Sequence, residues 1–323
     1  MKNTIAIFLI LIGILSCKTK EITVKDGRVV SFNRVPPNGI FINDTLICDE
    51  TEIANTDYRE YLYWVSRVFG YDSQTYQDAL PDTMASYNYI IKNIDNRDVL
   101  KKLYTYDSGE IYFRHPSYNN FPVIGLTYEQ AVKYSNWRTN VVFEVMLIHS
   151  DLIKIHTNLD STNYFTVERY ISGQYFNYKA PKGLYVARFR LPTIEEWESC
   201  VKQQNGDDWG IDAASKVVQK YKRKSPNLFM TKEHFSEALK KATDTTSQQV
   251  LVPFTKPVLS LFNYANKPYN MIGNVAEMTA TKGIAKGGSW AHPLEECKIK
   301  NTIRYDKPEA WLGFRNVCTW EKL

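Results

Sequence analysis

The chain has 323 residues, of which 44% are hydrophobic, and a formal net charge of +5 at pH 7. This length is sufficient for one large domain with a substantial core. The positive charge is mild and spread along the chain without a basic stripe, so the composition argues against nucleic acid as a partner.

The first residues have the pattern of an export signal. Lys2 gives a short positive start, residues 5–15 form an almost unbroken apolar run, and Ser16 precedes Cys17. Such a run is too short to span a bilayer as a helix. It resembles a bacterial lipobox, which implies that residues 1–16 are a lipoprotein signal peptide and that the thiol of Cys17 is acylated. A general signal peptide with a coincidental cysteine is the alternative.

The next segment, residues 17–37, is predicted to consist of the lipidated cysteine and a polar tether. No later stretch has the composition of a linker, so a single domain is expected to fill residues 38–323. No later stretch approaches membrane-spanning length either. We therefore expect a globular domain outside the cytoplasm, held at a membrane by the acyl chains on Cys17.

Within this domain, residues 41–47 are predicted to form a strand. Residues 56–69 are predicted to form a helix, because apolar and aromatic residues recur there at helical spacing. Residues 71–120 are rich in Tyr, Asp and Asn and are expected to be loops with short elements.

Capping boxes predict two helix starts. Thr127 is followed by Gln130, and Thr193 is followed by Glu196. In each case the hydroxyl can accept from an early amide while the longer side chain reaches back to the cap amide. A further helix is expected from Met230, with apolar residues on one side.

Four cysteines follow Cys17, namely Cys48, Cys200, Cys297 and Cys318. Outside the cytoplasm they could form two disulfides, in three possible connectivities. Their spacing contains no C-x-x-C, and the five histidines are scattered, so the pattern does not indicate a zinc site. Two bridges, one bridge or none remain open.

Five short segments occur in one order along the chain: TEIANTDY (51–58), FPVIGLTYEQA with the later NW (121–137), RLPTIEEWE (190–198), NMIGNVAEM (270–278), and GGSW (287–290) followed by GFR (313–315). Together they closely resemble the formylglycine-generating-enzyme family, the sulfatase-modifying factors, over about residues 40–320. The resemblance implies a single-domain, mixed α/β fold that is C-type-lectin-like in part and has little regular secondary structure.

The resemblance also implies one structural calcium site. Its ligands would be the Asn270 side chain, the backbone carbonyls of Gly273 and Val275, and the Glu277 carboxylate. These are hard oxygen ligands of the kind that Ca²⁺ prefers. A simple turn with positive φ at Gly273 and Asn274 is the alternative explanation of this segment.

The family's catalytic site is incomplete in this chain. Family enzymes oxidise a substrate cysteine with O₂, using a copper ion held by two thiolates, and soft thiolates suit Cu(I). Ser289 is present, but His292 stands where the resemblance places the first cysteine, and Cys297 lies near the second. We therefore expect the copper chemistry to be lost. Copper held by His292 and Cys297 as a mixed pair is the alternative.

Other segments narrow the resemblance to the gliding-motility lipoproteins of Bacteroidota, which are associated with type IX secretion. These segments are YWV (63–65), ALPDT (79–83), YFRHPSY (112–118) and WRT (137–139). The resemblance implies partners among envelope proteins. Lys18 and Lys20 follow the lipobox in place of acidic residues, which favours the periplasmic face of the outer membrane over the cell surface.

The sequence therefore predicts a non-catalytic interaction or structural lipoprotein of the outer membrane, related to gliding or type IX secretion. One alternative is a copper-dependent formylglycine-generating oxidase that acts on a substrate cysteine, for which Ser289 and Cys297 remain. Another is a glycan- or peptide-binding module that uses the tyrosine-rich residues 71–120, since exposed rings can stack on sugars and peptides.

Overall fold

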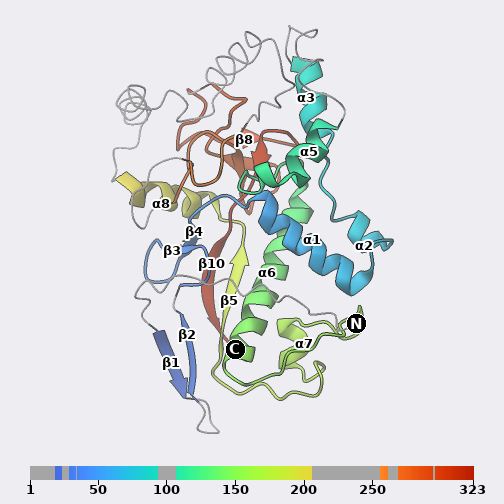
Figure 1. Cartoon of the computed structure of the whole chain (residues 1–323). Coiled ribbons are helices and arrows are strands. Elements are labelled where there is room, and N and C mark those ends of the chain that lie inside the picture. The colour runs from blue at the N-terminus through green and yellow to red at the C-terminus, as the bar shows by residue number, and fades with distance from the viewer. Residues whose placement is uncertain are drawn as a thin grey trace.

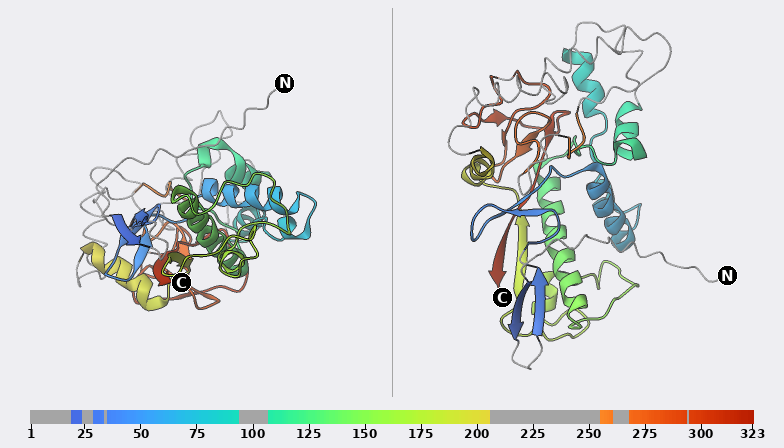
Figure 2. Two further views of the ribbon diagram at one scale, coloured as in Figure 1. Left: turned by 90° about the horizontal axis from the view of Figure 1, so that it is seen from below. Right: turned by 60° about the vertical axis from the view of Figure 1, so that its left-hand side comes forward.

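The computed structural model describes residues 19–23, 29–33, 35–93, 107–205, 255–260, 268–293 and 295–323. The predicted signal peptide, Cys17 and the helix predicted from Met230 lie outside these ranges. The arrangement of the elements is shown in Figures 1 and 2.

The helices of the described residues are α1 (Asn55–Phe69), α2 (Gln74–Gln77), α3 (Ala85–Asn93), α5 (Ser108–Arg114), the 3₁₀ turn η1 (Pro116–Tyr118), α6 (Tyr128–His149), α7 (Val167–Ile171) and α8 (Ile194–Asn205). The strands are β1 (Thr19–Thr23), β2 (Val29–Asn33), β3 (Gly39–Phe41), β4 (Ile47–Asp49), β5 (Tyr185–Arg190), β6 (Ala276–Met278), β7 (Ile284–Lys286), β8 (Ile303–Arg304), β9 (Leu312–Gly313) and β10 (Val317–Lys322). Most strands are short, as the expected mixed α/β fold with little regular structure requires.

One four-stranded sheet contains the six-residue strands β5 and β10 and is called the longer sheet below. Its strand order is β3-β4-β10-β5, and each pair of neighbouring strands in it is antiparallel. Side chains alternate between its two faces, as the pleat dictates. Cys48 and Val317 point into a core shared with α8, whereas Ile47 and Cys318 pack with Phe189 on the opposite face. The long helix α6 runs beside β5 (Figure 1).

The smaller sheet has the order β8-β7-β6-β9, in which β6 and β9 are parallel. Its buried residues share the largest core cluster with α1 and the first half of α6. Rings dominate the contact between these two helices, since Tyr58 stacks on Tyr134 and Tyr61 meets Trp137. Aromatic packing of this kind adds to the stabilisation from area burial.

Local signals located the helix starts correctly. Thr127 Oγ1 accepts from Gln130 N at 3.1 Å, and Gln130 Oε1 accepts from Thr127 N at 2.8 Å. Thr193 and Glu196 form the same reciprocal pair at 3.2 and 2.9 Å. The helix predicted at residues 56–69 is α1, which begins one residue earlier at Asn55.

The strand predicted at residues 41–47 is wrong. The chain forms two strands, β3 and β4, with a turn between them. Asn43 Oδ1 accepts from the backbone amides of Thr45 at 3.0 Å and Leu46 at 2.9 Å. The amides of Thr45 and Leu46 therefore bond to the Asn43 side chain, where a continuous strand would bond to a neighbouring strand. This local bonding stabilises a turn that reverses the chain.

A buried ion pair joins α6 to the longer sheet. Arg138 Nη1 lies 2.6 Å from Asp49 Oδ2, and both side chains are almost completely buried. The Arg138 guanidinium also lies over the Phe189 ring at 4.1 Å and donates to Pro37 O at 2.8 Å. Asp49 Oδ2 accepts from Asn316 N as well. One charge pair thus joins α6 to β4, to β5, to the residues before β3 and to the residues before β10.

Replacing Arg138 with Met should lower the free energy of unfolding by about 3–5 kcal/mol, because the Asp49 carboxylate would stay buried without its cation. Urea unfolding of the full chain measures this loss. Arg114→Met is the matched control, since the Arg114–Glu110 pair has the same 2.6 Å separation but is exposed. Its loss should be about 0.5 kcal/mol. Equal losses in the two variants would show that burial does not govern this ion pair.

Candidate functional site

The segment 270–278 is a bent loop followed by strand β6. Asn270, Gly273 and Asn274 all have positive φ, at 51°, 77° and 57°. Gly273 N donates to Gly287 O at 3.0 Å, which joins the loop to the Gly-Gly-Ser segment. The bend therefore carries both asparagine side chains inward, where the carboxylate of Glu52 accepts from them.

Glu52 is completely buried at the centre of this arrangement. Its Oε2 accepts from Asn270 Nδ2 at 3.0 Å, and its Oε1 accepts from Asn274 Nδ2 at 2.8 Å. Burial raises the pKa of Glu52 to about 8, although Arg315 opposes that rise. No spacing or composition in the sequence marks Glu52 as a functional residue. Its position within the first family-like segment was the only available signal.

A second buried carboxylate, Glu277, pairs with Arg315. Arg315 Nη2 lies 2.6 Å from Glu277 Oε1, and Arg315 Nε lies 2.7 Å from Oε2. Trp197 Nε1, from α8, also donates to Oε2 at 2.7 Å. All three side chains are at most 1% exposed. When Glu52 is ionised, two carboxylates therefore face one guanidinium.

This polar cluster fits the calcium ion implied by the resemblance. Asn270 Oδ1 is buried and has no hydrogen-bond partner among the described residues, while its Nδ2 is fixed by Glu52 and Val258 O. An unpaired buried amide oxygen is costly, and it is also a ligand that Ca²⁺ prefers. The ion would be held by Asn270, the Gly273 and Val275 carbonyls and Glu277, and its charge would favour the ionised form of Glu52.

The family's catalytic position lies on the segment after β7. Ser289 Oγ lies 2.6 Å from His292 Nδ1 and accepts from Ala291 N at 3.1 Å. Ser289 can donate its proton to Nδ1 when a neutral His292 carries its ring proton on Nε2, and it accepts from Nδ1 in the other tautomer. Burial lowers the pKa of His292 to about 4, so the ring is neutral at pH 7. The ring also stands edge-on to Trp311, at 4.8 Å.

Cys297 belongs to another hydrophobic cluster, although it lies against Gly288, the residue before Ser289. Its thiol is 1% exposed, clusters with Trp197 and Met271, and donates to Pro293 O at 3.4 Å. A Cβ placed on Gly288 would come within 2.1 Å of Cys297 Sγ. Gly288 also has a φ of 69°, so this position requires glycine both for its backbone conformation and for the close approach of the thiol.

The predicted catalytic residues are therefore only partly brought together. Ser289 contacts His292, whereas Cys297 packs behind Gly288 in another cluster. A copper site with two thiolates does not fit these residues, because one thiolate is missing from the sequence and the other thiol is buried. Within the described ranges, no group of three or more His, Cys, Asp or Glu side chains is arranged to hold a metal.

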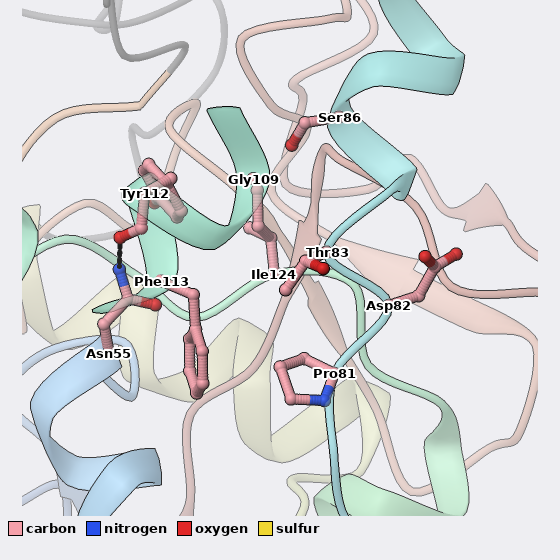
Figure 3. Close-up of a pocket in the computed structure, with 9 residues that line it drawn as sticks. All are labelled: Asn55, Pro81, Asp82, Thr83, Ser86, Gly109, Tyr112, Phe113 and Ile124. Carbon is pink, nitrogen blue, oxygen red and sulfur yellow. Dashed lines mark hydrogen bonds between the residues drawn. The ribbon is translucent and has the colours of Figure 1, made fainter. Parts of the chain in front are cut away.

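Two hollows in the described structure bear on substrate binding. One is an internal cavity of about 10 Å³ near Asn55, Thr83 and Tyr112 (Figure 3). The buried Asn55 Oδ1 has no hydrogen-bond partner within the described part of the chain. This volume suits one water molecule, not a substrate. The other is an open polar depression of about 430 Å³ lined by residue 296 and residues 300–303, and Cys297 does not line it.

The tyrosines of residues 71–120 are divided between surface and core. Tyr71 is 60% exposed and meets Tyr76 edge to face at 5.1 Å. Tyr112 is buried, and its hydroxyl donates to Pro122 O at 2.7 Å. Tyr112 is therefore a core residue, and of these three rings Tyr71 is the one placed to stack on a ligand.

Comparison with known proteins identifies the class of this fold. The model of the sulfatase-modifying factor enzyme 1-like domain, FGE-sulfatase, matches residues 13–320. The chain therefore belongs to this family, as the five segments predicted. No curated protein matches the chain.

Three solved structures show similarity at low identity. Treponema denticola variable protein 1 is 15% identical, with a TM-score of 0.41, and the match covers 94% of this chain and 99% of that one. CarF is 12% identical, with a TM-score of 0.37 and coverages of 93% and 96%. PvdO from Pseudomonas aeruginosa is 14% identical, with a TM-score of 0.31 and coverages of 62% and 63%.

The raised pKa of Glu52 predicts a pH-dependent stability. The folded carboxyl group keeps its proton up to about pH 8, whereas the unfolded one loses it near its ordinary value of 4.5. The stabilisation is thus complete below pH 4.5 and is lost as the pH rises to 8, by up to about 1.4 kcal/mol per pH unit. In buffer with a calcium chelator, urea unfolding between pH 5 and 8 should show this slope.

The variant Glu52→Gln cannot ionise and should show a shallower slope over the same range. It should also be less stable than the wild type at pH 5. The NH₂ group of the new glutamine would face the NH₂ group of Asn270 or Asn274, and two donors cannot form a hydrogen bond with each other. The exposed Glu195→Gln is the matched control and should keep the wild-type slope. An unchanged slope in Glu52→Gln would mean that Glu52 is already ionised in the folded protein.

Proposed function

We propose that this chain is a lipid-anchored protein of the bacterial envelope whose domain binds other envelope proteins without catalysing the family's oxidation. The burial of Cys297 carries this proposal. The one thiol near the family's copper position is 1% exposed behind Gly288, and the depression beside it is lined by other residues. Within the described residues, almost none of the Cys297 side chain is therefore accessible to a substrate thiol.

The geometry of His292 supports the same conclusion. Its Nδ1 is engaged by Ser289, and its ring packs on Trp311. The side chain therefore has a structural role at the place where the resemblance puts a copper-binding cysteine. Copper held jointly by His292 and Cys297 would require the Cys297 thiol to give up its hydrogen bond to Pro293 O.

The anchor and the location rest on the sequence. The lipobox ending at Cys17 supports acylation, and Lys18 and Lys20 favour the periplasmic face of the outer membrane. None of the helices in the described ranges is both long enough and apolar enough to cross a membrane.

The specific role that we propose is in gliding motility or type IX secretion, through envelope protein partners. It is supported by the four gliding-type segments. Two of them lie at structurally demanding positions. The backbone of Asp82 and Thr83 lies against Gly125 and Gly109, and Arg138 forms the buried ion pair. Normal gliding and secretion after deletion of the gene would contradict this role while leaving the non-catalytic scaffold intact.

Copper binding separates the scaffold from the oxidase. Titration of the full chain with Cu(I), followed by thiol-sensitive absorbance, should show no stoichiometric site that depends on Cys297, and wild type and Cys297→Ser should give the same curve. Cys318→Ser is the matched control, because Cys318 is equally buried on the other face of the longer sheet.

Tight binding of one Cu(I) that is lost only in Cys297→Ser would support the oxidase instead. In that case a Cys-x-Pro-x-Arg peptide should lose its thiol in an oxygen-dependent reaction.

We further propose that the loop from Asn270 to Glu277 binds one structural Ca²⁺. The unpaired Asn270 Oδ1, a buried amide oxygen of the kind that Ca²⁺ prefers, supports this proposal. A ligand that binds the folded state at one hundred times its Kd adds about 2.7 kcal/mol to stability.

Calcium should therefore raise the Tm of the full chain relative to chelator-treated protein. Asn270→Ala should abolish the calcium-dependent part of this shift, whatever its own stability. Asn88→Ala, an exposed position on α3, should leave the shift unchanged. The same shift in Asn270→Ala and wild type would place calcium elsewhere or reduce the loop to a turn.

A further inference from the structure

Two of the buried cysteines lie next to each other although they are far apart in the chain. Cys48 is on β4 and Cys200 is on α8, and both are at most 1% exposed. The two thiols interact with each other, and the Cys48 thiol also donates to Asp49 O at 3.4 Å. Both belong to the core cluster between the longer sheet and α8. The fold thus brings two sulfur atoms into contact distance.

The pleat of the longer sheet excludes Cys318 from this pair. Val317 is the register partner of Cys48, and both side chains point toward α8. Cys318 follows Val317 and therefore points to the opposite face, where it packs with Ile47 and Phe189. A bond between Cys318 and Cys48 or Cys200 would have to pass through the sheet.

Cys297 is the remaining competitor, because it belongs to the same cluster as Cys48 and Cys200. However, it packs against Gly288 and donates to Pro293 O at 3.4 Å. Cys48 makes a similar bond to its own neighbour, Asp49 O, so such local bonds do not decide the pairing. What favours Cys200 is its direct interaction with the Cys48 thiol.

We propose that Cys48 and Cys200 are a disulfide-forming pair that covalently joins α8 to the longer sheet. The two thiols would lose two protons and two electrons as the sulfur–sulfur bond forms. The oxidant would be another disulfide, carried by a small molecule or by a thiol oxidoreductase. The sulfur–sulfur bond of the oxidant breaks, and its two sulfur atoms take up the two protons and two electrons to become two thiols.

The burial of the two thiols determines the stage of folding at which the disulfide can form. The attacking species is a thiolate, and burial disfavours thiolates. Oxidation should therefore precede the docking of α8 on the sheet, or require α8 to open. Once formed, the bond would hold the helical turn that carries Trp197, whose indole donates to Glu277. The disulfide would thus stabilise the buried polar cluster from a distance.

Peptide mapping of the unaltered full chain tests this pairing without any variant. The chain is refolded with oxidised glutathione, its remaining thiols are alkylated in denaturant, and the digest is analysed by mass spectrometry without reduction. We expect a linked pair of peptides that carry Cys48 and Cys200, and alkylated peptides for Cys297 and Cys318. Full alkylation of Cys48 and Cys200, or a link to Cys297, would overturn the proposal.

Thermal unfolding gives a second measurement. The oxidised chain should have a Tm higher than the reduced chain by about 5 °C or more, because the bond closes a long loop in the unfolded state. This difference should disappear in Cys200→Ala and persist in Cys318→Ala, a variant of an equally buried thiol outside the pair. If peptide mapping detects the bond but the oxidised and reduced wild type have the same Tm, the bond does not stabilise the fold.

Discussion

The buried pair of Glu277 and Arg315 is the interaction around which the fold is assembled. Arg315 also donates to the carbonyls of Asp49 and Tyr269, at 3.0 and 2.7 Å, and Glu277 accepts from Trp197 of α8. The pair therefore connects strands β4 and β6, helix α8 and the loop before β10. Loss of either partner would leave an uncompensated charge in the core, so every one of these segments depends on the presence of the others.

Such charged junctions explain how a chain with so little regular structure keeps one conformation. Arg138 with Asp49, and Lys286 with Glu198, repeat the arrangement at other places. In each case a long cationic side chain also reaches a backbone carbonyl, that of Pro37 or Ile299. Loops that lack a ladder of hydrogen bonds thus satisfy their carbonyls with side chains. This is costly to assemble, but it specifies the path of irregular segments.

Local signals in the sequence predicted what depends on local interactions. The capping boxes at Thr127 and Thr193, and the helix at residues 56–69, are determined by neighbours within a few residues, and they were correct. The strand at residues 41–47 was not, because the Asn43 side chain competes for backbone amides in a way that strand patterning does not weigh. The family resemblance supplied the fold as a whole, which no local pattern could have given.

The candidate site was predicted only in part, for a physical reason. Asn270 and Glu277 could be named from their segment, but the environment of Glu52 depends on partners more than two hundred positions away in the chain. The absence of one of the two thiolates that the resemblance implies could be read from His292. That Cys297 is enclosed behind Gly288 could not, because this contact depends on the exact path of a loop.

The place of β10 in the longer sheet has a consequence for how an exported chain would fold. This strand, Val317–Lys322, lies between β4 and β5, which precede it by more than a hundred residues. A chain that crosses a membrane from its N-terminus delivers β4 and β5 long before the strand that separates them. Until then both would present unpaired edges, which attract other chains. Such a protein would depend on chaperones during export, and its most vulnerable period would end only when its last strand arrives.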